Sequence, residues 1–447
     1  MKFKHHLKDP SNKLSSWNAT ANSNCCQWDG VLCNNITSHI AQLHLNTPFP
    51  TFDDYEFYDK VYEEYTTQAF GGEINPCLVD LKHLNFLDFS CNLFGSIPIP
   101  SFIATITSLT HLNLSYAGFT ENIPPHFENL SNLLYLDLSS NELLGGGMPI
   151  PSFLGKMTTL IHLDLCHSGF MGNIPPQIGN LSNLLYLDLS SNELFGGGMA
   201  FPSFVGRMTS LIHLDISYSG FMGNIPPQIG NLSNLAYLGL IYFINGTIPS
   251  QIGNLSNLLY LKLRTVFLFT ENVDWLSSLS KLEYLDLEGA NLSHSTLPSL
   301  MHLHLSRCTS PHFNQLSFFN FSSLLTLHLF GIYHPSSIGF VPKWAFGQKI
   351  LVSLTFLSSN IKGPVPDGLR NLTLLENLDL RDNSLSSSTL DWFCNSLPHL
   401  KFLDLSSNIL QGTIPHILGN MTSLITLSLS TNNLKVQFQL LWIISAT

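Results

Sequence analysis

Leucines and other aliphatic residues recur along the chain at fixed spacings, with polar residues between them. The clearest example is Leu133-Leu-Tyr-Leu-Asp-Leu-Ser-Ser-Asn141, in which Leu136 and Leu138 alternate with polar side chains. Alternation with a period of two is typical of a strand that has one buried and one solvated face. The pattern therefore predicts a short strand, followed by a turn at Asn141, whose amide can bond neighbouring backbone groups.

The same Leu-x-x-Leu-x-Leu-x-x-Asn frame repeats over most of the chain, mostly in steps of about 23 to 28 residues. That period is typical of leucine-rich repeats and too short for repeats built from helix pairs. We therefore expect an α/β repeat fold, a right-handed solenoid of about sixteen coils with a parallel β-sheet on its concave face. The copies begin at Ile40, Leu84, Leu109, Leu133, Leu160, Leu184, Leu211, Leu235, Leu258, Leu282, Leu300, Leu324, Leu375, Leu400 and Leu424, with a degenerate copy at 352–360.

A second signature, Gly-x-Ile/Val-Pro, follows many of the predicted strands. Glycine permits a tight bend and proline fixes φ, so these positions are predicted to be extended segments outside the main sheet. A following Leu-x-x-Leu-like segment, such as Ile178-Gly-Asn-Leu181, predicts a helical or 3₁₀ turn. The signature occurs at 95–98, 172–175, 223–226, 246–249, 363–366 and 412–415.

A coarser repeat overlies the first one. Residues 102–152, 153–203 and 204–254 align at an offset of 51 residues, and each block comprises two coils. The agreement between blocks indicates tandem duplication, so a position at which one block differs from its copies is informative.

Composition excludes several classes of protein. Apolar residues make up 44% of the chain and charged residues 11%, which favours an ordered core. A net charge of −11 with 19 dispersed Lys and Arg residues argues against a nucleic-acid partner. There is no Gly-x-Ser-x-Gly, His-Glu-x-x-His or phosphate-loop motif, so neither an enzyme nor a cofactor is expected.

Twelve Asn-x-Ser/Thr sequons favour a glycosylated protein of the secretory pathway. The alternative is that the Leu-Ser-Asn content of the repeats generates them by composition, since six share one phase of the repeat. The sequons are at Asn18, Asn35, Asn113, Asn129, Asn180, Asn231, Asn245, Asn254, Asn291, Asn320, Asn371 and Asn420.

Neither end of the sequence carries a targeting or membrane segment. Residues 1–7 have charge but no apolar core, and residues 440–444 fall far short of the roughly 20 apolar residues of a membrane span. Either the protein is intracellular or this chain lacks its ends.

The N-terminal region and the repeat frame together resemble a known family, the plant leucine-rich-repeat receptor-like proteins and receptor-kinase ectodomains. The likeness rests on the full plant-type frame and on Asp9-Pro-Ser-Asn-Lys-Leu-Ser-Ser-Trp17 with Cys25-Cys-Gln-Trp-Asp-Gly-Val-Leu-Cys33. Within the family, the chain is most similar to immune receptor-like proteins. The expected domains are an N-terminal cap at 1–39, a solenoid at 40–433 with an insert at 47–70, and a non-repeat tail at 434–447.

The resemblance implies a disulfide between Cys26 and Cys33. In the family the first cysteine of the pair bonds a cysteine further upstream, but this chain has none before Cys25. We therefore expect the chain to be truncated at its N-terminus, and at its C-terminus as well, where the family's cysteine cap and membrane span are missing. The sequence leaves open the pairing of Cys25, Cys77, Cys91, Cys166, Cys308 and Cys394.

Solvent-facing strand positions are the default binding surface of such a fold. In many coils they read Tyr or His, then Asp, then Ser, which is most simply a solvated polar face. From Leu235 to Phe330 this order breaks down, and aromatic, cationic and imidazole groups typical of interface hot spots appear. The alternative is ordinary drift. The ligand-binding candidates are Tyr237, Ile241, Tyr260, Lys262, Arg264, Tyr284, Asp286, Glu288, His302, His304, His328 and Phe330.

The basic residues and the histidines of this surface carry two further expectations. Lys262 and Arg264 are expected to be solvated, so that replacing both with Ser leaves folding intact. His302, His304 and His328 lack a supporting carboxylate or cysteine, so no metal site is expected.

The insert at 47–70 interrupts the first coil with acidic and aromatic residues unlike any other segment. It is either a flexible surface loop or a contact loop for a basic partner.

The leading hypothesis, implied by the resemblance, is a receptor ectodomain at the plant plasma membrane or in the apoplast. It would bind a protein or peptide on the concave face in defence signalling and act through a co-receptor kinase, held to the membrane by a segment absent from this chain. The alternatives are a secreted inhibitor of microbial cell-wall hydrolases and a truncated, non-functional relic.

Overall fold

The computed structural model describes residues 2–18, 24–48, 58–142, 144–194, 201–242, 247–264, 273–288, 297–308, 321–332, 343–386, 396–414, 418 and 421–435. The chain forms two compact units, Met1–Phe243 (unit 1) and Ile244–Thr447 (unit 2). Within the described residues, no helix is both long enough and apolar enough to cross a membrane.

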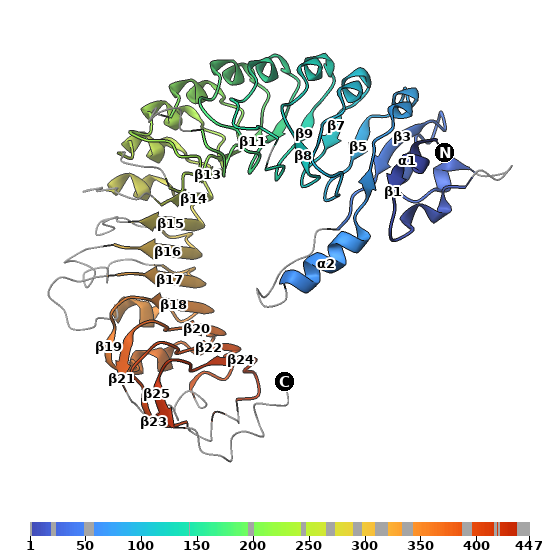
Figure 1. Cartoon of the computed structure of the whole chain (residues 1–447). Coiled ribbons are helices and arrows are strands. Elements are labelled where there is room, and N and C mark those ends of the chain that lie inside the picture. Colours follow the sequence, from blue (N-terminus) through green and yellow to red (C-terminus); the bar gives the residue numbers. More distant parts are fainter. Residues whose placement is uncertain are drawn as a thin grey trace. The chain divides into compact units, whose positions relative to one another are not determined.

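Unit 1 is built on a parallel sheet to which each repeat contributes one strand (Figure 1). Consecutive strands pair in register, so that Leu136 lies between Leu112 and Leu163 of the neighbouring strands. This confirms the predicted leucine frame. The strands are β3 (Ile40–His44), β5 (Phe86–Asp88), β7 (His111–Asn113), β9 (Tyr135–Asp137), β10 (His162–Asp164), β11 (Tyr186–Asp188), β12 (His213–Asp215) and β13 (Tyr237–Gly239).

Unit 2 repeats this arrangement. The degenerate copy predicted at 352–360 forms β18, which pairs with a strand on either side. The strands are β14 (Tyr260–Leu263), β15 (Tyr284–Glu288), β16 (His302–Ser306), β17 (Thr326–Phe330), β18 (Ser353–Leu357), β20 (Asn377–Asp379), β22 (Phe402–Asp404) and β24 (Thr426–Ser428).

The leucines of the frame form a continuous core within each unit. Leu133, Leu136 and Leu138 are fully buried, as are the matching residues of the neighbouring coils. Each fully buried leucine contributes about 1.5–3 kcal/mol relative to an exposed one. A single coil cannot bury its own leucines, so the stacking of coils is what stabilises the chain.

The asparagine that closes the frame satisfies backbone groups of two coils at once. Asn192 is 3% exposed, and its Nδ2 donates to the carbonyl oxygens of Leu165 and Leu189 at 2.8 and 3.0 Å. Its Oδ1 accepts from the backbone N–H groups of Ser168 and Phe170 at 3.2 and 3.1 Å. The role predicted for Asn141 is therefore confirmed as a column of amides, most of them buried. The same pattern occurs at Asn92, Asn141, Asn383, Asn408 and Asn432.

The predicted turn after the glycine–proline signature is a 3₁₀ helix. In η8, Pro175 is the N-cap residue and Pro176 is the first helical residue, and the proline ring holds φ near its helical value. Ile178 is buried beneath this turn. These helices are η4 (Pro76–Asp80), η5 (Ser101–Thr105), η6 (Pro125–Asn129), η7 (Ser152–Lys156), η8 (Pro176–Asn180), η9 (Ser203–Arg207), η10 (Pro227–Asn231), η11 (Ser250–Asn254), η12 (Asp274–Ser278), η14 (Lys343–Gly347) and η15 (Asp367–Asn371).

The predicted extended segments form short parallel pairs outside the main sheets. Gly95 has a φ of 82°, which favours glycine, at the bend that precedes the first of these strands. The pairs are β6 (Ile97–Pro98) with β8 (Phe119–Thr120), β19 (Lys362–Pro364) with β21 (Ser384–Ser386), and β23 (Gln411–Thr413) with β25 (Asn433–Lys435). Strand β25 includes the first two residues of the predicted non-repeat tail, which was expected to begin at residue 434.

A small cap covers the first coil of unit 1. Trp17 is 4% exposed, stacks on Trp28 with ring centroids 5.3 Å apart, and donates from Nε1 to the Asp29 carbonyl at 2.8 Å. Strand β2 pairs antiparallel with β3 and so joins the cap to the sheet. The cap comprises α1 (Lys2–His6), η1 (Lys13–Ser16), η2 (Cys25–Gln27), β2 (Val31–Cys33), and β1 (Leu7–Lys8) paired with β4 (Gly71–Gly72).

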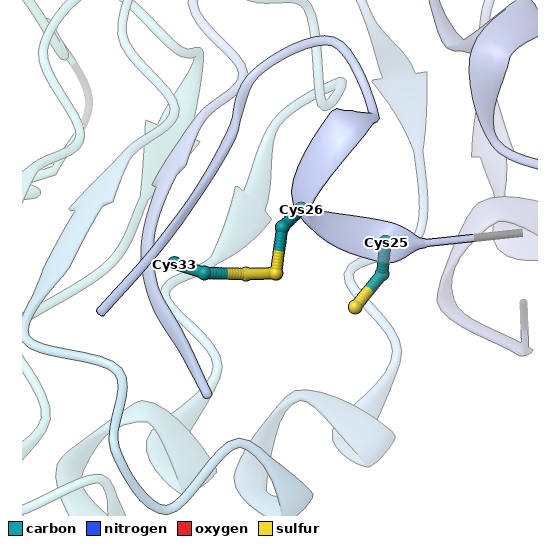
Figure 2. A group of neighbouring side chains, drawn as sticks. All are labelled: Cys25, Cys26 and Cys33. Carbon is teal, nitrogen blue, oxygen red and sulfur yellow. A yellow bond between two sulfur atoms is a disulfide. The ribbon is translucent and has the colours of Figure 1, made fainter. Parts of the chain in front are cut away.

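The predicted disulfide is present. Cys26 and Cys33 are bonded, which links η2 to β2, and the Sγ atom of the neighbouring Cys25 lies within 4.8 Å of both bonded sulfurs (Figure 2). Among the described cysteines, Cys25, Cys77, Cys91, Cys166 and Cys308 are not in disulfide bonds, and Cys394 lies outside the described residues.

Replacing Asn192 with Ala should lower the free energy of unfolding by about 2–4 kcal/mol, because buried backbone groups on two coils lose their partner. Chemical denaturation followed by circular dichroism measures this. Asn183→Ala in the same coil is the control, since exposed Asn183 makes one bond, to the Thr158 carbonyl. Equal effects of the two substitutions would contradict a special role for the buried amide column.

Candidate ligand-binding surface

The side chains between the buried leucines lie on the opposite face of each sheet, which we call the open face. Because the strands pair in register about 4.8 Å apart, side chains of one repeat phase form a column that crosses the strands. Two such columns of unit 1 and a mixed region of unit 2 are the candidate surfaces.

The first column of unit 1 is a stack of aromatic and imidazole rings. Successive ring centroids are 3.9 to 4.3 Å apart, and most neighbouring planes lie within about 13° of parallel. The sequence indicates the alternation of Tyr and His but not the stacking, which needs the in-register sheet. The column consists of His44, Phe86, His111, Tyr135, His162, Tyr186, His213 and Tyr237.

Beside the rings runs a carboxylate column. Each carboxylate accepts a hydrogen bond from the backbone N–H two residues further on, as Asp188 Oδ1 does from Ser190 at 2.8 Å. Asp137 and Asp164 are only 9% exposed, so the expected solvated face is in fact largely buried here. The column consists of Asp88, Asp137, Asp164, Asp188 and Asp215, with Asn113 between the first two.

Burial and mutual repulsion shift the ionisation of both columns. Burial, together with the charges of Asp137 and Asp188, raises the pKa of Asp164 to about 7. Burial also raises the pKa of Asp188 to about 6, with Asp215 contributing. For His162, burial and the neighbouring imidazoles lower the pKa to about 4. The His162 ring is therefore neutral at physiological pH, and Asp164 and Asp188 lie among like charges.

In unit 2 the structure brings most of the predicted ligand-binding residues together. Registry places Lys262, Asp286, His304 and His328 side by side on β14 to β17, with the Tyr260 and Phe330 positions at opposite ends of the patch. Tyr237 and Ile241 lie in unit 1, on and just after β13. The residues of this patch are Tyr260, Lys262, Arg264, Tyr284, Asp286, Glu288, His302, His304, His328 and Phe330.

Arg264 is not a freely solvated residue, which corrects the expectation from sequence. Its Nε lies 3.2 Å from Asp286 Oδ1, and the two side chains are 35% and 6% exposed. Burial raises the pKa of Asp286 to about 6 despite the opposing charges of Arg264 and Lys262. Replacing Arg264 with Ser would leave a buried carboxylate without this partner, so it would affect folding.

The rest of the patch is held by a network of contacts between strands. Lys262 Nζ lies 5.6 Å from the centre of the Tyr284 ring, and Tyr284 Oη lies 3.3 Å from His304 Nδ1. His304 stacks on His328 at 4.3 Å. Burial, with His328 contributing, lowers the pKa of His304 to about 3, so this imidazole is neutral. The network presents an ordered surface with mixed polar and aromatic groups.

The three histidines of this patch do not gather around a common point. His302 Nδ1 lies 2.9 Å from Thr326 Oγ1, away from the His304–His328 stack. In the described part of unit 2, no three side chains of metal-binding type place ligand atoms within coordination reach of one another.

Part of the insert forms a helix, α2 (Tyr58–Gln68), which the sequence did not predict. Residues 49–57 of the insert lie outside the described residues. Tyr65 is buried, with its ring 6.1 Å from that of Tyr116, and Phe70 is buried after the helix. Glu63 and Glu64 are exposed, so a contact with a basic partner stays a prediction.

Family models match most of the chain. A model for a "Leucine-rich repeat region" matches residues 151–363, and one for a "Leucine rich repeat N-terminal domain" matches residues 1–34. A single-repeat model, "Leucine Rich Repeat", matches residues 108–130, 132–157, 374–396 and 399–421.

Individual proteins agree with these models. The chain is 30% identical to Receptor-like protein 41 of Arabidopsis thaliana, over 91% of this chain and 47% of that protein. It is 32% identical to Receptor-like protein EIX1 of Solanum lycopersicum, over 42% of this chain and 18% of that protein. The Arabidopsis receptor kinase HAESA, solved with the peptide hormone IDA and the co-receptor SERK1, shares the fold, with a TM-score of 0.56 at 22% identity over 97% of this chain and 85% of that chain.

The chain spans less than half the length of Receptor-like proteins 41 and EIX1. Its repeats, its cap and its sequence matches nevertheless agree. The chain belongs to the family of plant leucine-rich-repeat receptor-like proteins.

Proposed function

We propose that this chain is the ligand-recognition region of a plant cell-surface receptor in defence signalling, and that it binds a protein or peptide on the open face of β14 to β17. The observation that carries the proposal is the patch around Lys262, Tyr284 and His304. There, side chains of different chemistry replace the Tyr/His–Asp–Ser order of unit 1 and contact one another across neighbouring strands.

The chemistry of the patch suits a peptide-like ligand. Tyr260 and Phe330 are 39% and 36% exposed, which leaves aromatic surface for apolar contacts. Lys262 and the Arg307–Glu288 pair at 3.3 Å add charged groups at the same face. Aromatic anchors surrounded by polar groups are typical of interface hot spots. The ordering of these side chains by their neighbours lowers the entropy lost on binding.

The relatives support the class of ligand and partner. HAESA was solved with a peptide hormone and a co-receptor. By analogy, we propose that the full-length protein passes its signal through a co-receptor kinase. The likeness of the chain to receptor-like proteins supports a location on the extracellular side of the plasma membrane.

The glycosylation sequons are compatible with this location. Five of the six that share one repeat phase lie at the ends of 3₁₀ helices with exposed side chains, where an oligosaccharide meets no core residue. They are Asn129, Asn180, Asn231, Asn254 and Asn371. Asn18 and Asn35 are also exposed, whereas Asn113 lies within β7 and its Oδ1 already accepts from Ser115. Asn245, Asn291, Asn320 and Asn420 lie outside the described residues.

Short random peptides displayed on phage and selected on the immobilised chain provide a test of the patch. Peptides enriched on the chain should lose affinity by about tenfold or more on Tyr260→Ala and on Lys262→Ser, because each substitution removes a hot-spot contact. Surface plasmon resonance with the synthesised peptides measures the change.

Lys281→Ser is the matched control for this experiment. Lys281 lies in the same unit, is exposed, and donates to Asn257 away from the patch. Its loss should leave peptide affinity unchanged. Selected peptides that bind the patch variants as well as the original chain would exclude the open face of β14 to β17 as the recognition surface.

Chain secreted from plant cells should fall markedly in apparent mass when treated with an N-glycosidase, because exposed sequons are accessible to glycosylation. Gel electrophoresis and peptide mass mapping measure the shift and the occupied sites. The exposed sequons should be occupied and Asn113 should be free of glycan. An unchanged mass would count against passage through the secretory pathway.

A further inference from the structure

Three side chains of different type converge at one point of the open face of unit 1. Asp188 of β11 and His213 and Asp215 of β12 each place one ligand atom within 4.8 Å of the other two. All three residues are partly exposed on the open face, with the Nε2 atom of His213 buried. Their convergence follows from the sheet, because in-register pairing sets Asp188 beside Asp215.

The donor set suits a first-row divalent transition metal. Zn²⁺ binds imidazole nitrogen and carboxylate oxygen at about 2.0–2.2 Å, and three protein ligands with one water form a common open site. Ligand atoms 4.8 Å apart or closer reach such an ion through small side-chain rotations. An imidazole ligand favours Zn²⁺ over Mg²⁺ or Ca²⁺, which prefer oxygen donors.

Neighbouring groups orient two of the three ligands, Asp215 and His213. Tyr237 Oη donates to Asp215 Oδ2 at 2.8 Å, and the Ser217 N–H donates to Asp215 Oδ1 at 2.8 Å. The His213 ring is stacked between Tyr186 and Tyr237, with centroids 4.2 and 4.1 Å away. Hydrogen bonds and packing behind the ligands are what hold a metal site in shape.

The charge of the surroundings also favours a cation. Asp164, Asp188 and Asp215 lie on consecutive strands, and within the described residues none of them forms an ion pair with lysine or arginine. A divalent cation would relieve the repulsion between these carboxylates. At the next strand the column ends at Gly239, where an added Cβ would lie 2.5 Å from the Asp215 carboxylate. Because Gly239 has no side chain, the Asp215 carboxylate can occupy that space.

A second group, Asp164, Cys166 and Asp188, adjoins the first and shares Asp188 with it. Its thiol must lose a proton between two carboxylates before it can bind a metal, whereas imidazole binds in the neutral form. The group that contains His213 is therefore the better site.

We propose that unit 1 binds one Zn²⁺ ion through Asp188, His213 and Asp215, with water completing the coordination. The site is separate from the peptide surface proposed on unit 2 and does not depend on it. Bound zinc would tie β11 to β12 and neutralise the charges of Asp188 and Asp215 on this acidic face.

The repeats themselves supply substitutions that the fold already accepts. His213→Tyr copies Tyr186 and Tyr237 in the ring column, and Asp188→Asn copies Asn113 in the carboxylate column. The first removes the imidazole ligand and the second removes the charge of a carboxylate ligand, and both keep the packing. His162→Tyr, in the ring column but outside the site, and Cys166→Ser, which copies Ser190 and Ser217, are the controls.

Isothermal titration of the whole chain with ZnCl₂ at neutral pH tests the proposal. The original chain, His162→Tyr and Cys166→Ser should each bind one Zn²⁺ with the same affinity. His213→Tyr and Asp188→Asn should weaken zinc binding by more than about tenfold. Loss of a residue that only hydrogen-bonds a metal ligand already lowers metal affinity by about that factor. Circular dichroism of each variant verifies that it is folded.

Thermal unfolding supplies a second readout. Zinc should raise the midpoint of unfolding of the original chain and both controls, but not that of His213→Tyr, because only the folded site binds the ion. Absence of saturable binding, equal binding by His213→Tyr and the original chain, or loss of binding in Cys166→Ser would each overturn the assignment.

Discussion

In-register pairing of short parallel strands is the constraint on which the rest of the structure depends. Each coil adds only three to five strand residues, and its neighbour repeats the same phase about 4.8 Å away. The leucines of successive coils therefore form one core within each unit. The closing asparagines, such as Asn192, bond carbonyl and N–H groups of two adjacent coils. A shift of one residue would expose the leucines and break both sets of contacts.

The same constraint decides the chemistry of the open face. A residue type that recurs at the same position of each repeat lies beside its own copies on the neighbouring strands. This proximity is favourable for flat rings and unfavourable for carboxylates. The ring column of unit 1 accordingly packs at about van der Waals spacing, whereas the neighbouring aspartates raise one another's pKa. In unit 2 the equivalent column reads Lys262, Asp286, His304 and His328, and opposite charges lie side by side. Departure from the repeat thus replaces repulsion with pairing.

These features explain which parts of the molecule were predictable from sequence. The leucine frame, including the degenerate copy that forms β18, could be predicted because the spacing of its apolar residues is visible in the sequence of each single coil. The Cys26–Cys33 disulfide was implied by family resemblance and is present. The stacking of His162 between Tyr135 and Tyr186 depends on contacts between coils, and no single coil encodes it. Pairing between Arg264 and Asp286 was missed for the same reason, since the two residues belong to different strands.

Repetition also limits where specificity can arise. A ligand that contacts only repeated columns meets nearly the same side chains on each strand, so it gains little from any one position along the sheet. Positions that differ from their copies supply distinct contacts. Lys262 and His304 do so in unit 2, while Cys166 and Gly239 interrupt the order of unit 1. Each such change is tolerated because it lies on the open face, where the leucine core and the asparagine column place no demand on the side chain. The fold thereby separates the residues that maintain it from those that are free to acquire a function.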